Sequence, residues 1–197
     1  MTLPRAVSQL VTPPTQEPLT LDEAKLRAGL DWVAGDPRDQ LMLGFISAAR
    51  QQVEADTGLA LLTQTRDVFY DQSPTFLPAQ CRPLQQIVEL VSIDDSGEHP
   101  IPALTRALIG VRLQAALLPG YGGRSTVDGT PTAYRMRVIV GWTAPLQLPP
   151  LLVHACGLLT AHYATNGRDL TTSGTIITTT PLGYAEAVSP FLQVTLA

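Results

Sequence analysis

The chain has 197 residues, which is enough for a domain with a real hydrophobic core, and 45% of them are hydrophobic. Charged residues make up only 15% of the chain, against roughly 25% in an average protein. The net charge of −4 comes with no basic stripe of the kind that binds nucleic acid. Two explanations of the low charge stay open: a biased genome composition, or a surface covered by other subunits.

Charges are rarest near the C-terminus, where residues 138–197 contain only Arg168, Asp169 and Glu186. The apolar run at 148–163 falls short of the roughly 20 apolar residues that a membrane-spanning helix needs. A buried or subunit-covered helix is therefore expected there. The N-terminus lacks the pattern of a signal peptide, so we expect the protein to be made and kept in the cytoplasm.

The first expected element in chain order is an extended arm at residues 1–19, because four prolines fall within it. Helices are expected over residues 20–62. Thr20 and Glu23 have the spacing of a capping box, and the helix that they begin should end near Gly29.

A second helix is predicted over residues 37–57, with Asp36 as the cap and Gly58 as a left-handed end. Apolar residues recur within it at three- and four-residue spacing. If Phe45 is fully buried, its replacement by Ala should cost about 3–5 kcal/mol. The expected apolar face consists of Leu41, Met42, Phe45, Ile46, Ala49 and Val53.

The middle of the chain, residues 63–143, is predicted to be an inserted antiparallel β region, because β-prone runs alternate there with turn signals. A core helix at 148–167 should pack on the helix at 37–57, and residues 168–197 should form a C-terminal tail. The expected fold class is α+β, mainly α: a small helical core with the β insertion, the extended N-terminal arm and the tail. All of these parts are assigned to one domain, 1–197.

The sequence offers little for catalysis. His154 and His162 flank Cys156 on the uncharged helix, without a metal-ligand spacing or a carboxylate partner. Cys156 and Cys81 form no CxxC motif, and the glycine-rich loop at 120–125 lacks the GK[ST] ending of a phosphate loop. We therefore expect no catalytic residues, no bound metal and no cofactor.

The threonine-rich segment at 175–180 combines β-branched residues with no charge and no proline. Such a run is prone to edge-to-edge pairing unless another strand covers it. Two interpretations stay open: a surface loop, or a strand that is added to a partner's sheet.

Several segments, taken in order, resemble the head-to-tail connector (adaptor) proteins of long-tailed bacteriophages and gene transfer agents. The resemblance covers nearly the whole chain, although it is weak over residues 71–133. The chain departs from the family at Phe191-Leu192, where the family often has Tyr-Arg, and at Gly167-Arg168-Asp169, which replaces a more compact helix end. The segments that carry the resemblance are Val11-Thr12-Pro13-Pro14, Glu17-Pro18-Leu19-Thr20-Leu21-Asp22-Glu23-Ala24-Lys25, Ile46-Ser47-Ala48-Ala49-Arg50, Val53-Glu54, Thr57-Gly58, Leu62-Thr63-Gln64-Thr65, the helix at 149–163, Pro181-Leu182-Gly183 and Pro190-Phe191.

The resemblance implies a structural virion protein, not an enzyme, which forms a dodecameric ring in the neck of the particle. The ring would join the portal protein to a stopper or tail-terminator protein, after assembly in the bacterial cytoplasm. Double-stranded DNA would pass through its lumen without sequence-specific binding. The acidic balance of the chain suits a channel that does not grip phosphate.

Residues 168–197 are then expected to be the portal-docking tail. Alternatives are another neck or tail component, such as a stopper or tail terminator, or a small hydrolase. The candidate portal-contact residues are Thr175, Ile176, Ile177, Thr178, Thr179, Thr180, Pro181, Leu182, Gly183, Tyr184 and Phe191.

Overall fold

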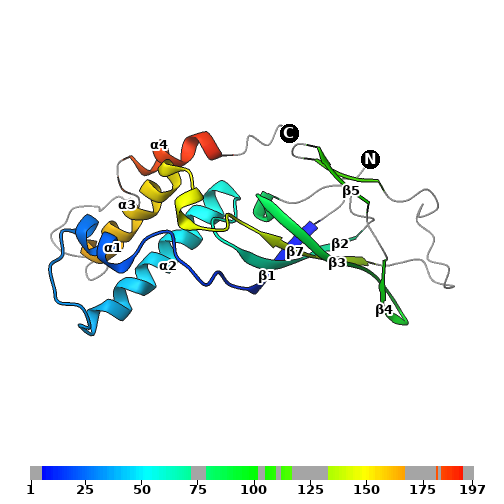
Figure 1. Ribbon diagram of the computed structural model, residues 1–197, viewed down its shortest axis with the longest axis horizontal. Helices are drawn as coiled ribbons and strands as arrows, with labels where there is room; N and C mark the ends of the chain where they lie inside the picture. The colour runs from blue at the N-terminus through cyan, green and yellow to red at the C-terminus, as the bar shows by residue number, and fades with distance from the viewer. Residues whose placement is uncertain are drawn as a thin grey trace, which may run out of the picture. The chain divides into compact units, whose positions relative to one another are not determined.

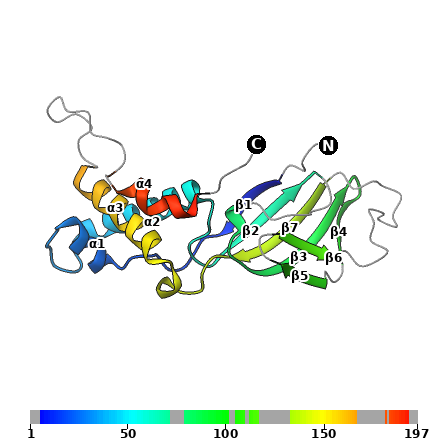
Figure 2. The same cartoon turned by 90° about the horizontal axis from the view of Figure 1, so that it is seen from above.

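The computed structural model describes residues 6–71, 79–101, 105–109, 112–116, 133–166, 181 and 183–192. The chain divides into two compact units (Figures 1 and 2). The β unit contains Met1–Pro13 and Thr63–Gly141, and the helical unit contains Pro14–Leu62 and Trp142–Ala197. Their organisation as one connector domain stays a prediction.

The helical unit begins with α1 (Leu21–Ala28) and α2 (Arg38–Thr57). The predicted capping box is confirmed, since Thr20 Oγ1 accepts the Glu23 N–H and Glu23 Oε2 accepts the Thr20 N–H. Asp36 Oδ1 accepts the Arg38 N–H at 2.8 Å, but the N-cap of α2 is Pro37 and not Asp36 as expected. Both helices end at left-handed glycines, where a side chain would strain the backbone.

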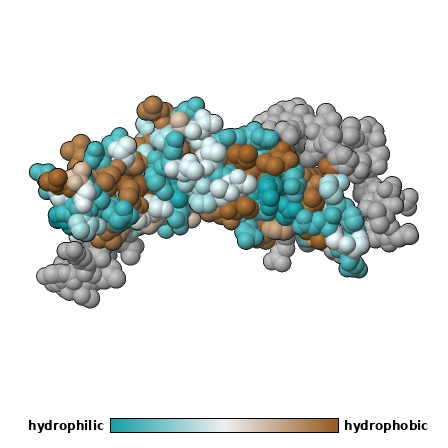
Figure 3. Space-filling view, turned by 60° about the horizontal axis from the view of Figure 1, so that its bottom comes forward, coloured by the Kyte–Doolittle hydropathy of each residue, from teal (hydrophilic) through white to brown (hydrophobic). Residues whose placement is uncertain are grey.

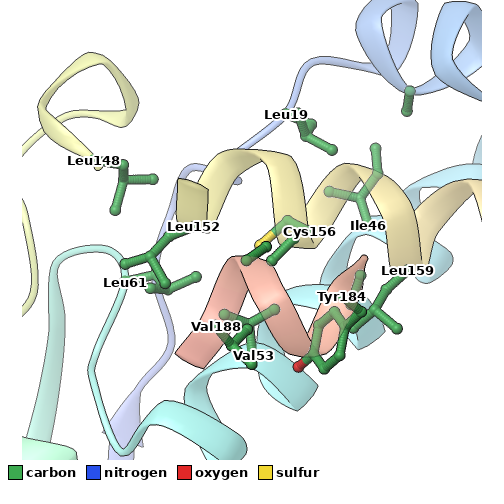
Figure 4. Close-up of a cluster of buried hydrophobic side chains, with 14 of the residues drawn as sticks. Leu19, Ile46, Val53, Leu61, Leu148, Leu152, Cys156, Leu159, Tyr184 and Val188 are labelled. Atoms are coloured by element: carbon green, nitrogen blue, oxygen red, sulfur yellow. The ribbon is translucent and has the colours of Figure 1, made fainter. Parts of the chain in front are cut away.

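α3 (Pro150–Asn166) packs on α1 and α2, which confirms the predicted contact between the two long helices. The short helices α4 (Tyr184–Val188) and η3 (Ser189–Phe191) follow, and η2 (Pro145–Gln147) precedes α3. Figure 4 shows the shared core, in which side chains of α2, α3 and α4 meet. Its labelled residues are Leu19, Ile46, Val53, Leu61, Leu148, Leu152, Cys156, Leu159, Tyr184 and Val188.

The buried face of α2 differs from the expected one. Met42, Ile46, Ala49 and Val53 are buried, but Leu41 is 51% exposed. Spacings of four, three and four residues keep the buried four in one stripe, and Leu41 lies on its flank. Phe45 is only partly buried, so the cost stated for full burial does not apply to it.

The β unit contains a five-stranded antiparallel sheet in the order β1-β2-β7-β3-β4, and a separate two-stranded sheet, β5-β6. Alternation along β7 puts Tyr134, Met136, Val138 and Val140 on one buried face. The strand bounds are Ala6–Thr12 (β1), Gln64–Tyr70 (β2), Leu84–Asp94 (β3), Gly97–Pro100 (β4), Thr105–Ile109 (β5), Arg112–Ala116 (β6) and Ala133–Val140 (β7), and the turn η1 spans Ala79–Cys81.

The expected N-terminal arm is wrong, because Ala6–Thr12 is strand β1 and pairs along β2. The prolines at 4, 13, 14 and 18 flank this run and do not interrupt it. The partner strand, β2, lies more than fifty residues further along the chain, so no local sequence pattern predicts that β1 pairs with it.

The expected mainly-α class is also wrong, since a five-stranded sheet accompanies the helices in a mixed α+β fold. The C-terminal segment is likewise not all tail. Tyr184, Ala187 and Val188 share one face of α4 and are buried in the helical core. Among the described residues, no helix is long and apolar enough to cross a membrane.

We predict that Ile46→Ala lowers the free energy of unfolding by about 2–5 kcal/mol, because Ile46 is fully buried between helices. The matched control, Leu41→Ala on the same helix, should cost less than about 1 kcal/mol because Leu41 is half exposed. Urea unfolding measures both. Equal costs at the two positions would contradict this assignment of the buried face.

Candidate functional site

The structure describes four of the predicted portal-contact residues: Pro181, Gly183, Tyr184 and Phe191. Tyr184 is 4% exposed, and its hydroxyl donates to Asp56 Oδ2 at 2.5 Å. Burial, with Asp56 beside it, raises the pKa of Tyr184 far above its usual value, so the hydroxyl remains a donor. Phe191 is partly buried against the same core. The other candidates, 175–180 and Leu182, lie outside the described residues.

These contacts show that α4, which the predicted tail includes, belongs to the core of the helical unit. The side chain of Tyr184 holds α4 on α2 of its own subunit, and Ala187 and Val188 fill the core beside it. α4 therefore stabilises the helical unit. Residues 175–180 lie outside the described residues, so their docking role stays a prediction.

A buried ion-pair network lies at the centre of the helical unit. The side chain of Arg50 is 4% exposed; its Nε lies 2.8 Å from Glu17 Oε2, and its Nη1 lies 3.0 Å from Glu54 Oε2. Glu54 Oε1 also accepts the Leu61 N–H at 2.9 Å. A buried guanidinium is tolerated only when such partners surround it. The network joins the chain before α1, the middle of α2 and the segment that leads to β2.

A second charge cluster fixes the loop between α1 and α2. Lys25 Nζ and Trp32 Nε1 each lie 2.7 Å from Asp39 Oδ1, and the Gly35 N–H donates to Oδ2. The hydrogen bond from Lys25, helped by that from Trp32, lowers the pKa of Asp39. The Arg38 guanidinium lies 4.5 Å from the centroid of the Trp32 ring. This cluster holds Trp32 in place at the surface.

An apolar groove of about 400 Å³ opens beside that loop. The Trp32 ring forms one wall, and half-exposed Leu41 forms part of the rim. Figure 3 shows apolar residues in several patches between polar ones, not as one continuous face. Tryptophan and arginine are enriched among the residues that contribute most to protein contacts. The groove is lined by Leu30, Trp32, Arg38, Leu41, Met42, Phe45, Ala164 and Thr165.

In the β unit, two arginines of β7 pair with carboxylates from three other strands. Arg137 makes a bidentate contact with Asp67 of β2, with both distances 2.7 Å. Arg135 Nη2 lies 2.7 Å from Glu89 of β3 and 2.6 Å from Glu98 of β4. The hydrogen bond from Arg137 lowers the pKa of Asp67. These ion pairs fasten four strands together on the face opposite the apolar one.

The β3–β4 turn contains a serine, a histidine and an aspartate, which the hydrolase alternative would require. Ser96 Oγ and Asp94 Oδ1 both lie near the same nitrogen of His99, Nε2, at 2.9 and 3.1 Å. A catalytic triad needs the serine and the carboxylate on different ring nitrogens. Ser96 Oγ also donates directly to Asp94 at 2.6 Å. This arrangement stabilises a turn and does not activate a nucleophile.

The two cysteines are free and buried. Burial raises the pKa of Cys81 to about 11 and that of Cys156 to about 12, which keeps both thiols protonated and unreactive. His154 is exposed on α3 and His162 is partly exposed. Within the described ranges, no three His, Cys, Asp or Glu side chains come together as metal ligands would.

Comparison with solved structures finds the same fold in neck assemblies. A chain of the "Neck of empty GTA particle computed with C6 symmetry" superposes with a TM-score of 0.73 at 22% identity, over 97% of both chains. This chain shares the fold of proteins in the particles of gene transfer agents. A chain of the "Virion of native gene transfer agent (GTA) particle" gives 0.72 at 20% identity, over 96% of this chain and 97% of the other.

A chain of the "Neck of native GTA particle computed with C12 symmetry" gives a TM-score of 0.68 at 20% identity, over 97% of both chains. No protein-family model and no curated protein sequence matches the chain. The likeness therefore lies in the fold and agrees with the resemblance that the sequence motifs indicated.

The sequence interpretation missed two surfaces, the edge of β1 and the groove beside Trp32. The run Ala-Val-Ser-Gln-Leu-Val-Thr at 6–12, uncharged and bounded by prolines, was a usable strand signal. No local sequence pattern predicts the groove, because the residues that line it come from segments far apart in the chain.

We predict that the Asp67–Arg137 pair makes stability depend on pH. The folded-state pKa of Asp67 lies below its ordinary value of 3.8, so the pair's contribution is complete above about pH 4 and is lost as the pH falls through the folded-state pKa. The stability gap between wild type and Asp67→Asn should therefore be largest near neutral pH and shrink in acid.

Urea unfolding at a series of pH values measures this gap. The matched control is Asp95→Asn, which changes an exposed acid in the β3–β4 turn. The difference in unfolding free energy between wild type and Asp95→Asn should stay near zero at every pH. A gap for Asp67→Asn that is the same at every pH would contradict the ion-pair assignment.

Proposed function

We propose that this chain is a structural subunit of the neck of a gene transfer agent or tailed-phage particle. It forms a ring that joins the portal to the next neck or tail protein, and DNA passes through the ring. The observation that carries the proposal is the likeness of nearly the whole chain to chains in neck assemblies. The likeness includes both units, so it covers more than a common helical core.

Three features of the chain support a structural role. Its low charge content suits a surface covered by neighbouring subunits. Its buried and partly buried ion pairs join elements of the fold to one another. Its acidic balance suits a channel through which DNA slides.

Ring formation on the portal is the first test. The purified chain, mixed with the portal of its own particle, should give a complex that electron microscopy shows as a closed ring stacked on the portal ring. The C12 symmetry named for one neck neighbour leads us to expect twelve copies. Binding to the tail-side proteins without binding to the portal would instead identify a stopper or tail terminator.

We further propose that residues 175–180 dock on the portal by backbone pairing, with Pro181 ending the ladder because it has no N–H to donate. Because Tyr184, Ala187 and Val188 belong to the core, a deletion of the whole C-terminus would destabilise the subunit. The suitable variant replaces only residues 175–180 with an equally long Gly/Ser linker.

This linker variant should keep the wild-type unfolding curve but co-purify with portal at least about tenfold less well, a difference of about 1.4 kcal/mol in binding. The matched control, Leu146→Ser, removes an apolar side chain that is 99% exposed elsewhere on the helical unit. It should bind portal like the wild type. Full-strength portal binding by the linker variant would show that 175–180 is not the docking element.

A further inference from the structure

The two edges of the five-stranded sheet are unlike each other. β1 forms one edge and β4 forms the other. β4 has only four residues, ends in Pro100 and contains Glu98, whose carboxylate is held by Arg135. A short length, a charge and a proline are the features by which natural proteins prevent pairing at an edge.

β1 has none of these protective features. It has seven residues without a charge, a proline or a glycine. Val7 is 65% exposed, Leu10 43% and Val11 44%. Among the described strands, only β2 pairs with it. An uncharged edge with three exposed apolar side chains, in regular register from Ala6 to Leu10, is a ready template for another strand, and a partner that covers it would remove this hazard.

The symmetry of a ring restricts which strand can cover this edge. Pairing of β1 with β1 of a second copy would be two-fold symmetric and would stop at a dimer. A closed ring needs two different surfaces, one of which meets the other on the next copy. The edge of β1 must therefore receive a different segment.

The β5–β6 hairpin has the right character for that segment. Within the described part of the chain its two strands pair only with each other, and an isolated two-stranded sheet is marginally stable. β5 has five residues, and the regular register of β1 with β2 also extends over five residues, from Ala6 to Leu10. Neither β1 nor the hairpin contains an acidic residue, so no like-charged acids oppose the pairing.

We propose that β1 is the strand acceptor between neighbouring copies, and that the β5–β6 hairpin of one copy extends the sheet of the next along this edge. This inference rests on the proposed ring, and the strand pairing is the contact that would close it. It gives each copy one acceptor edge and one donor hairpin, which is the heterologous arrangement that a cyclic assembly requires.

Disulfide trapping on assembled rings tests the pairing directly. Val7→Cys is combined, in separate full-length variants, with a cysteine at each position of Thr105–Ile109, and rings formed on the portal are mildly oxidised. The native cysteines are buried and do not interfere. Covalent ladders that extend beyond dimers at some of these positions are expected. Val7→Cys alone should give no product.

A second variant gives an independent readout. Val7→Lys places a charge on the edge strand, and we expect the ring fraction seen by electron microscopy to fall at least about tenfold. Val33→Lys is the matched control, since Val33 is an 85%-exposed valine between α1 and α2, outside the sheet. It should change the ring fraction less than about twofold. Circular dichroism confirms that both variants are folded.

The possible failures are distinguishable. If the wild-type chain forms no ring on the portal, the proposed function fails, and this inference fails with it. If rings form but no double-cysteine variant gives a ladder and Val7→Lys assembles normally, the ring stands and the strand pairing is wrong. Dimers from Val7→Cys alone would show β1–β1 pairing and would overturn the inference too.

Discussion

The helical unit depends on two ion pairs, which the buried Arg50 makes with Glu17 and with Glu54. Glu17 belongs to the chain that leads into α1, and Glu54 uses its second oxygen to accept the Leu61 N–H. Leu61 in turn accepts the Trp142 N–H, and Leu62 forms a bridge with Trp142. The network thereby fixes the place where the chain leaves the helical unit for the β unit and returns. Removing Arg50 would leave two carboxylates facing each other with no cation between them.

The sequence motifs that resemble connector proteins contain the residues of this network. These motifs therefore determine how the chain folds and not which partner it binds. Glu17, Arg50, Glu54 and Gly58 all lie in the segments that resemble connector proteins. Three of them make the buried ion pairs, and Gly58 ends α2 in the left-handed conformation. Surfaces that meet partners have no such fixed chemistry. The fold is shared with the chains of gene transfer agent particles at 20–22% identity.

The parts of the fold that sequence predicted are those with a local physical cause. The capping box at Thr20 and the glycine that ends α2 each depend on neighbouring residues, and both are present. The run at 6–12 was itself a strand signal, but its pairing partner could not be predicted, because that strand lies far along the chain. The burial of Tyr184 was missed because its partner, Asp56, lies 128 residues away. The exposure of Leu41 shows that periodicity finds a helix more securely than it finds the centre of the buried face.

The central claim is that this chain links the head of a particle to its tail, and the most direct measurement is of particles assembled without it. Electron microscopy of lysates from cells that lack only this chain should show DNA-filled heads and separate tails, because the portal would have nothing to receive the tail. Supplying the chain in trans should restore joined particles. Complete, tailed particles in its absence would contradict the account.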